Sequence, residues 1–159
     1  MKNTLLPLFL LLLFSSCGST SVVKSQGASV APGTNVPFRK VANESFAENY
    51  IDADILVDCR FFSSQAATAS YTTKKLPKNH FAFQVISTDA NPNADQLSSS
   101  LTSLIVLVPT EYSDMIFSLK KGDKIQLRGG TYVTKAKYGS FFGLNQRYVH
   151  FKATSIQKQ

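Results

Sequence analysis

The sequence predicts an all-β domain of five strands with one short helix, preceded by a signal peptide and a flexible tether. Three observations predict this fold class. Residues 51–62 alternate between apolar and polar types over twelve positions, which is typical of a half-buried strand. Residues 104–108 form the continuous apolar run LIVLV, which indicates a strand buried on both faces. After Pro109 the apolar period changes from two residues to that of a helix.

Length and composition bound the class of protein. The chain has 159 residues, of which 43% are hydrophobic and 17% are charged, and this size favours a single domain with a working core. The apolar fraction is too high for a wholly disordered chain, and two cysteines are too few for a disulfide-stapled miniature fold. A membrane protein with several spans is excluded as well, because only the N-terminus carries a long apolar run.

Residues 1–16 read MKNTLLPLFLLLLFSS, a lysine followed by an apolar run and two serines. The apolar run from Leu5 to Phe14 is too short to span a bilayer, so it predicts a secretory signal. The string FSSC that ends at Cys17 resembles the lipobox of bacterial lipoproteins, in which the thiol is lipidated and the chain is cut before it. That resemblance implies a mature chain anchored by Cys17 in the bacterial cell envelope, with the outer membrane as the expected destination because Gly18, not Asp, follows. The alternative is an ordinary signal peptide cut nearby, which would leave Cys17 as a free thiol.

The lipid anchor is followed by a tether. In residues 18–35, ten of eighteen positions are Ser, Thr, Gly or Pro, a composition that favours a flexible linker. We expect residues 17–43 to form the lipidated cysteine and linker, and residues 44–159 to form the domain. Such a linker would reach roughly 28 Å.

The remaining elements follow from local patterns. Asn43 is placed to cap a short helical turn. The helix after Pro109 is expected to have about ten residues and to end at Gly122. The strands are expected at 51–62, 80–87, 104–108, 124–133 with a bend at Gly129 and Gly130, and 147–156, with a loop over 135–145 between the last two.

Two features of the first strand have simple structural interpretations. Cys59 lies on its apolar face and is expected to be a buried, inert thiol. Asp52, Asp54 and Asp58 share the other face, but no histidine accompanies them, so a solvated face that discourages aggregation explains them better than a metal or acid–base site.

Residues 119–129 read LKKGDKIQLRG, which closely resembles the turn L-x-x-G-D-x-V-x-V-x-G by which many OB-fold domains enter their fourth strand. The order of three strands, a helix and two strands agrees with that family. The resemblance covers about Phe46 to Ile156 and implies a five-stranded, OB-fold-like Greek-key barrel. By itself it identifies no ligand.

The family's usual binding surface implies a candidate site. It is the face of the second and third strands, flanked by the loop between strands one and two and by the loop between strands four and five. The residues in these loops that suit a ligand are Tyr71, Lys74, Lys75 and Lys78 in one, and Lys135, Lys137, Tyr138, Phe141 and Phe142 in the other. An aromatic and basic mixture is typical of single-stranded nucleic-acid sites, although Phe141 and Phe142 could also simply plug the barrel end.

Charge and motif content favour binding over catalysis. Residues 120–159 contain nine basic residues and one acidic residue, which suits an anionic surface or serves solubility. The two histidines, His80 and His150, are expected at the surface, and no hydrolase, phosphate-loop or metal motif is present. We therefore expect a membrane-anchored, non-enzymatic binding or adaptor module without metal or cofactor. Its partner would be an envelope protein, a glycan or an anionic lipid; nucleic-acid binding is the alternative, and an envelope hydrolase a third possibility.

Overall fold

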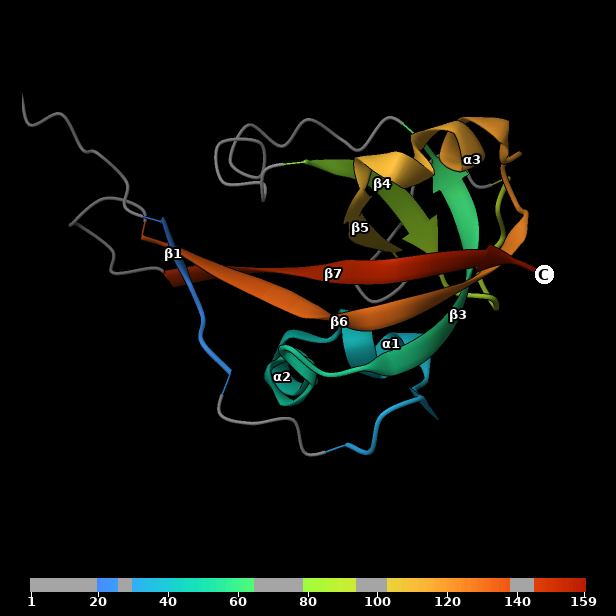
Figure 1. Ribbon diagram of the computed structural model, residues 1–159. Coiled ribbons are helices and arrows are strands. Elements are labelled where there is room, and N and C mark those ends of the chain that lie inside the picture. Colours follow the sequence, from blue (N-terminus) through green and yellow to red (C-terminus); the bar gives the residue numbers. More distant parts are fainter. Residues whose placement is uncertain (1–19, 26–29, 65–78, 94–102, 138–144) are drawn as a thin grey trace, which may run out of the picture.

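The computed structural model describes residues 20–25, 30–64, 79–93, 103–137 and 145–159 (Figure 1). The protein is mostly β, with a few short helices. The strands are β1 (Thr20–Val22), β2 (Thr34–Asn35), β3 (Ile55–Ser63), β4 (His80–Ile86), β5 (Ser103–Pro109), β6 (Lys124–Lys137) and β7 (Asn145–Lys158). The helices are α1 (Phe38–Ala42), α2 (Glu44–Ala47) and α3 (Ser113–Ser118), and the 3₁₀ turns are η1 (Glu48–Tyr50) and η3 (Thr110–Tyr112). Among these residues, no helix has the length and apolar content that crossing a bilayer requires.

The seven strands form one mixed sheet in the order β1-β6-β7-β5-β4-β3-β2. An additional antiparallel pairing between β3 and β6 joins five strands, β3, β4, β5, β7 and β6, into a ring. Within the ring only β5 and β7 are parallel. Because β6 returns to lie beside β3, the run β6-β3-β4-β5 has the order of a Greek key.

Each strand of the ring contributes side chains to one apolar core. Fully buried examples, one from each strand, are Val57, Phe83, Val106, Leu127 and Phe151. In β3, β4 and β6 they alternate with more exposed residues, as the period of two requires, whereas Leu107 next to Val106 and His150 next to Phe151 are buried as well. Ile116 of α3 also lies in this core, so the helix packs one apolar stripe on the ring.

Gly129 bends β6 where the strand leaves the ring. Its φ of +150° lies in a region that L side chains rarely adopt, and the β6–β7 register shifts between Arg128 and Gly129. A Cβ at Gly129 would overlap the carbonyl oxygen of Lys152 and lie 2.9 Å from the Cα of Ala153. The bend expected from the paired glycines is therefore confirmed, but β6 continues through it to Lys137.

The last two strands are longer than the sequence predicted. The pairing of β6 with β7 extends to Lys137 and Asn145, so residues 135–137 lie in a strand and not in the expected loop. The α-helix after Pro109 is shorter than the predicted ten residues. A 3₁₀ turn precedes six α-helical residues that end at Ser118. Gly122 has a φ of +95° and follows the helix in a turn, where the carboxylate of Asp123 accepts from the backbone N–H of Lys120.

The first strand begins later than expected. Residues 51–54 keep the predicted alternation of burial but are not a strand, because Asp52 adopts a left-handed φ of 57° and turns the chain before β3. Ile51 makes only an isolated bridge to Thr131. Asn43 caps a helix as predicted, since its side-chain oxygen accepts from the backbone N–H of Ser45 at 2.8 Å.

The folded part begins before Asn43, the boundary expected from composition. Val36, Phe38 and Val41 are buried in the main core, and β2 pairs in parallel with β3. Further upstream, β1 pairs with the free edge of β6. The apolar residues before Asn43 therefore pack against the core or pair with the edges of the sheet. Composition alone does not reveal these contacts.

The predicted burial of Cys59 is confirmed, and two of the three aspartates in this segment are held by other side chains. Cys59 is fully buried, and burial raises the pKa of its thiol. Asp54 forms a bidentate pair with Arg128, at 2.7 Å for both oxygens, and Asp58 accepts from side-chain amides of Asn35, Gln126 and Gln159. The described residues contain no group of three or more potential metal ligands.

Candidate ligand-binding cleft

Most of the site residues named from the sequence lie outside the described residues. This applies to Cys17, to Tyr71, Lys74, Lys75 and Lys78, and to Tyr138, Phe141 and Phe142. Lys135 and Lys137 lie on the backbone of β6, where they pair with Arg147 and Asn145 of β7. The structure therefore gives the strand positions of two of these residues and does not test the site as a whole.

The face expected to bind a partner is the outer face of β4 and β5. Phe83 and Val106 point into the core, so the alternate positions Ala82, Gln84 and Ile105 lie on the outer face, where they are half-buried. These side chains carry no charge. This face offers shape and apolar contact and little that would select a charged ligand.

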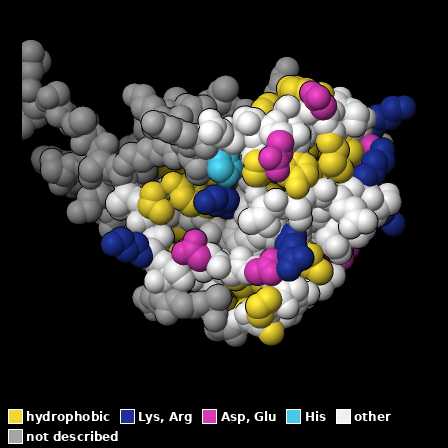
Figure 2. Space-filling model, in the orientation of Figure 1, with side chains coloured by type: hydrophobic (Ala, Val, Ile, Leu, Met, Phe, Trp, Pro, Cys, Tyr) yellow, Lys and Arg dark blue, Asp and Glu magenta, His cyan; other side chains and the backbone are white. Residues whose placement is uncertain are grey.

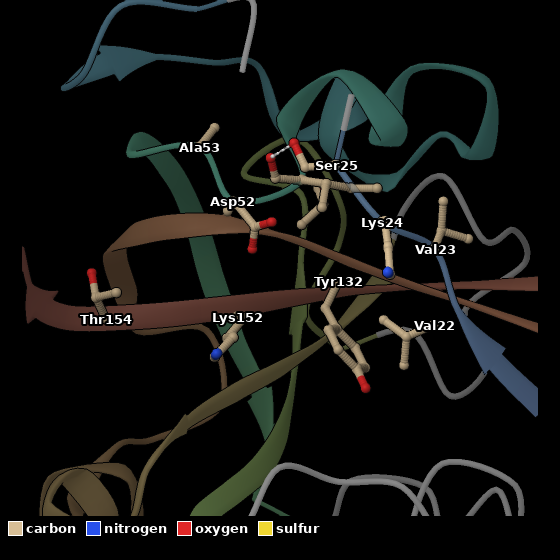
Figure 3. A pocket seen from close by; sticks show the side chains of 12 residues that line it. Val22, Val23, Lys24, Ser25, Asp52, Ala53, Tyr132, Lys152 and Thr154 are labelled. Atoms are coloured by element: carbon tan, nitrogen blue, oxygen red, sulfur yellow. Dashed lines mark hydrogen bonds between the residues drawn. The ribbon is translucent and has the colours of Figure 1, made fainter. Parts of the chain in front are cut away.

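A cleft lies on the outer face of β6 and β7, beside the bend at Gly129 (Figure 3). Its volume is about 610 Å³, within the range of small-molecule sites. Four segments of the chain surround it: the end of β1 with the residues after it, the loop before β3, strand β6 and strand β7. The lining residues are Val22, Val23, Lys24, Ser25, Ile51, Asp52, Ala53, Gly130, Thr131, Tyr132, Lys152 and Thr154.

Backbone contacts hold the N-terminal wall of the cleft in place. The N–H of Val23 donates to the carbonyl oxygen of Val133 at 2.9 Å, which continues the β1–β6 pairing by one residue. The hydroxyl of Ser25 donates to the carbonyl oxygen of Ile51 at 3.2 Å and so ties this segment to the loop before β3. A small cluster of Ala47, Ile51 and Val133, with Val23 against it, packs beneath these contacts. Residues 22–25 thus form one wall of the site.

The opposite wall is formed by alternating residues of the two long strands. Phe151 and Ala153 are buried in the ring, so Lys152 lies on the outer face, where it pairs with Gly130. Gly130 brings the backbone close to its neighbours, since a Cβ there would lie 2.7 Å from the carbonyl oxygens of Tyr50 and Ala53. The absence of a side chain at this position allows the loop before β3 to lie directly against β6, where it forms one side of the cleft.

Three charged side chains and one tyrosine, each from a different segment, surround the opening. Figure 3 shows Lys24 from the N-terminal wall, Asp52 from the loop, Tyr132 from β6 and Lys152 from β7 around one space. Lys24, Asp52 and Lys152 are exposed, and Tyr132 is half-buried. Burial raises the pKa of the Tyr132 phenol, so the ring stays neutral at physiological pH. The cleft thus offers two cations, one anion and a neutral aromatic surface.

His150 lies beside Tyr132 and is buried, contrary to the expectation of a surface residue. Its ring centroid is 6.2 Å from that of Tyr132, and its backbone pairs with Tyr132 on one side and Ile105 on the other. The side chains of Tyr132 and Ile105 share its face of the sheet and flank it on both sides. Burial lowers the pKa of His150 to about 4, against a smaller opposing effect of the Tyr132 backbone. The imidazole is therefore neutral at physiological pH, and among the described residues its Nδ1 has no hydrogen-bond partner.

Few acid–base groups are found among the described residues that line the cleft. Among the described residues that line it, Asp52 is the only carboxylate, and there is no histidine or cysteine. Glycoside hydrolysis generally requires two carboxylates, and the next one along the chain, Asp54, is held by Arg128. Hydrogen bonding to Arg128 lowers the pKa of Asp54, which keeps it ionised and unsuited to act as a general acid.

The surface charge is mixed on the face shown in Figure 2, where basic and acidic side chains lie next to one another. The excess of basic residues after Lys120 therefore does not make this face uniformly positive. Comparison of the chain with models of known protein families gives no match, and comparison with curated proteins gives none either.

Sequence reasoning missed this cleft for two reasons. The linker-like composition of residues 18–35 concealed that Val22 to Ser25 form a wall. Tyr132 and Lys152 belong to different strands, so only their pairing across β6 and β7 brings them to one face. The run TSVV at 20–23, rich in β-branched residues, was the one local signal for a strand.

Proposed function

We propose that this chain is a lipid-anchored, non-enzymatic OB-fold protein of the bacterial cell envelope, and that it is a binding module for an acidic glycan. The OB-fold assignment is supported by the ring of five strands, the helix between its third and fourth strands, and the glycine bend in the fourth. The Greek-key order of β6-β3-β4-β5 supports it as well.

The anchor is proposed from the lipobox-like string that ends at Cys17. After lipidation and cleavage, the protein would be held on a membrane, with the outer membrane as its expected location, and Cys59 would be the single remaining thiol. A lipid anchor of several acyl chains holds a protein stably without a spanning helix.

The observation that carries the proposed ligand is the placement of Lys24 and Lys152 around Tyr132 in one cleft. A neutral aromatic ring offers a flat apolar surface for a sugar ring, while two ammonium groups attract carboxylate or phosphate substituents. Asp52 and the backbone around Gly130 can accept hydrogen bonds from hydroxyl groups. An acidic glycan of the envelope combines all three kinds of group.

Metabolic acyl labelling tests the anchor. Wild type and Cys17→Ala are expressed with a labelled fatty acid, and membranes are separated from soluble material. We expect label and membrane association in wild type and neither in Cys17→Ala. Unlabelled wild type would overturn the anchor and, with it, the proposed location.

Sedimentation with purified envelope glycan tests the ligand. The chain from residue 18 is used, together with Tyr132→Ala, Lys24→Gln and Lys152→Gln. We expect each variant to weaken binding about fivefold to tenfold. Lys124→Gln is the matched control because it removes an exposed lysine from the same strand as Tyr132, outside the cleft. Equal binding by all variants would reject the cleft.

The same chain from residue 18 also tests whether the ligand is a nucleic acid and not a glycan. Tyrosine and lysine side chains also suit single-stranded nucleic acid, whose binding would weaken steeply with salt. Binding of single-stranded DNA or RNA that exceeds glycan binding at physiological salt would replace the glycan by a nucleic acid as the ligand.

A further inference from the structure

Asp52 lies in a turn whose backbone is fixed on both sides. Its neighbours Ile51 and Ala53 are buried, Ile51 in the small cluster with Val133 and Ala53 in the main core. The N–H of Ala53 donates to the carbonyl oxygen of Tyr50 at 3.2 Å and closes the turn. Between its two buried neighbours, the side chain of Asp52 is exposed and lines the cleft. The turn therefore holds a carboxylate at a defined place beside the opening.

The backbone of Asp52 adopts a left-handed conformation, with a φ of 57°. Glycine occupies this region at the lowest conformational cost, and Asp and Asn tolerate it better than other residues do. The chain nevertheless carries an acidic side chain here. Figure 3 shows its carboxylate directed into the space that Lys24 and Lys152 border. The cleft thus contains an anion whose position is set by the backbone before any ligand arrives.

The charges around the cleft do not neutralise one another. Among the described residues, no ion pair within 4.0 Å joins Asp52 to Lys24 or Lys152. The acidic residues of α2 and η1, Glu44 and Glu48, do not line the cleft. A ligand with acid groups alone would pair with the lysines but would also face the Asp52 carboxylate, and like charges at short range oppose binding. A ligand that carries both signs of charge would satisfy all three side chains.

We propose that Asp52 recognises an ammonium group, so that the ligand of the cleft is an amino glycan that carries acid groups as well. The proposal rests on the proposed binding of an acidic glycan and adds a second charged group to that ligand. Lys24 and Lys152 would contact the acid group, and Tyr132 would contact the sugar ring. Asp52 would accept hydrogen bonds from the ammonium group. Two lysines against one aspartate still favour a ligand of net negative charge.

Three simple sugars test this assignment. The chain from residue 18, which retains every described residue, is titrated with glucosamine and with the phosphate esters of glucosamine and N-acetylglucosamine at the primary hydroxyl. The first sugar carries only the amine, the second carries both charges, and the third carries only the acid group. An exposed charge pair of favourable geometry changes affinity by up to about fivefold. We expect the wild type to bind glucosamine phosphate about fivefold more tightly than N-acetylglucosamine phosphate, and to bind glucosamine most weakly.

Two variants of Asp52 separate its charge from its shape. Asp52→Asn keeps the size of the side chain and tolerates the same φ, and Asp52→Gly suits this backbone best, so neither is expected to disturb the fold. Both should lose the fivefold preference for the amine. Both should also bind N-acetylglucosamine phosphate at least as tightly as the wild type does, because the opposing carboxylate is gone. The matched control is Glu44→Gln, which removes an exposed carboxylate outside the cleft and should keep the preference.

The results distinguish this inference from the proposed function. If the wild type binds both phosphates equally, or if Asp52→Asn keeps the preference, the role of Asp52 is wrong and the acidic ligand stands. If Glu44→Gln loses the preference as well, net charge attracts the amine and the role of Asp52 is again wrong. Binding of neither phosphate would overturn the proposed acidic ligand and this inference with it.

Discussion

The long strands β6 and β7 run through two regions of the molecule, and these regions differ in the contacts that stabilise them. Below Gly129, β6 pairs with β3 and belongs to the ring, whose core is made of large, fully buried side chains from five strands. Beyond Gly129, β6 pairs with β1, and a small second cluster of Ala47, Ile51 and Val133 is buried beside this part of the strand, which we call the extension. Hydrophobic burial of large side chains stabilises the ring. The extension is stabilised mainly by backbone hydrogen bonds between strands and by a few contacts of small side chains. The cleft lies in the extension.

The largest effect is expected at the boundary itself. Gly129→Ala would place a methyl group onto the Lys152 carbonyl oxygen at a φ that alanine rarely adopts. Since the backbone on both strands must move, we expect a loss of more than about 4 kcal/mol in the free energy of unfolding, measured in urea.

Gly33→Ala is the matched control for this prediction. Gly33 also has a positive φ, but among the described residues no atom lies within 4 Å of the added Cβ. We expect Gly33→Ala to lower the free energy of unfolding by only about 1 to 2 kcal/mol, which is the cost of placing alanine in a left-handed conformation. If the two variants lose equal stability, the close packing at Gly129 does not set the boundary between ring and extension.

A pair of truncations separates the two regions. Leu127→Ala removes a fully buried side chain from the ring and should cost about 3 to 4 kcal/mol, whereas Val133→Ala in the extension should cost about 1.5 kcal/mol. Cys59 reports on the ring, because its buried thiol reacts with a thiol reagent only when the ring opens. In a chain that begins at residue 18, Leu127→Ala should accelerate this reaction strongly and Val133→Ala should leave it unchanged. Equal acceleration would show that ring and extension open together.

His150 should make stability depend on pH in a defined window. Its pKa of about 4 in the folded protein lies below the ordinary value of 6.5, so the unfolded chain binds the proton more readily. Stability is therefore lost as the pH falls from 6.5 toward 4, by about 2 kcal/mol between pH 7.5 and pH 5.

Urea denaturation at several pH values measures this loss, with His150→Phe as the comparison. The variant should show a flat profile above pH 5, because the carboxylates with lowered pKa, Asp54, Asp58 and Asp123, titrate only below about pH 4. A profile that is equally steep in the variant would assign the pH dependence to other groups.

The ring was predictable from sequence because its signals are local and repeated. The alternation along residues 55–61 placed Cys59 in the core, and the change of period after Pro109 located the helix. The paired glycines gave the bend because few other residues can occupy it.

The extension was not predictable in the same way, because its contacts join residues far apart in the chain. Nothing local distinguishes Val23 in a flexible tether from Val23 bonded to Val133. Likewise, the polar face of residues 148–152 suggested exposure for His150, whereas long-range strand pairing places it between Ile105 of β5 and Tyr132 of β6, where it is buried. The cleft lies where such long-range pairings meet, so its residues could not be assembled from motifs.

The smallest effect is expected from the ion pair between Asp54 and Arg128, which links the loop before β3 to β6 next to the bend. Its geometry is favourable, with two hydrogen bonds of 2.7 Å, yet the side chains are 40% and 52% exposed. Water and salt screen such a pair, and fixing two side chains costs entropy, so Arg128→Gln should lower the thermal midpoint only slightly. In 1 M NaCl the difference from wild type should vanish. A large loss that persists in high salt would instead mean that this pair, and not Gly129, holds the extension to the ring.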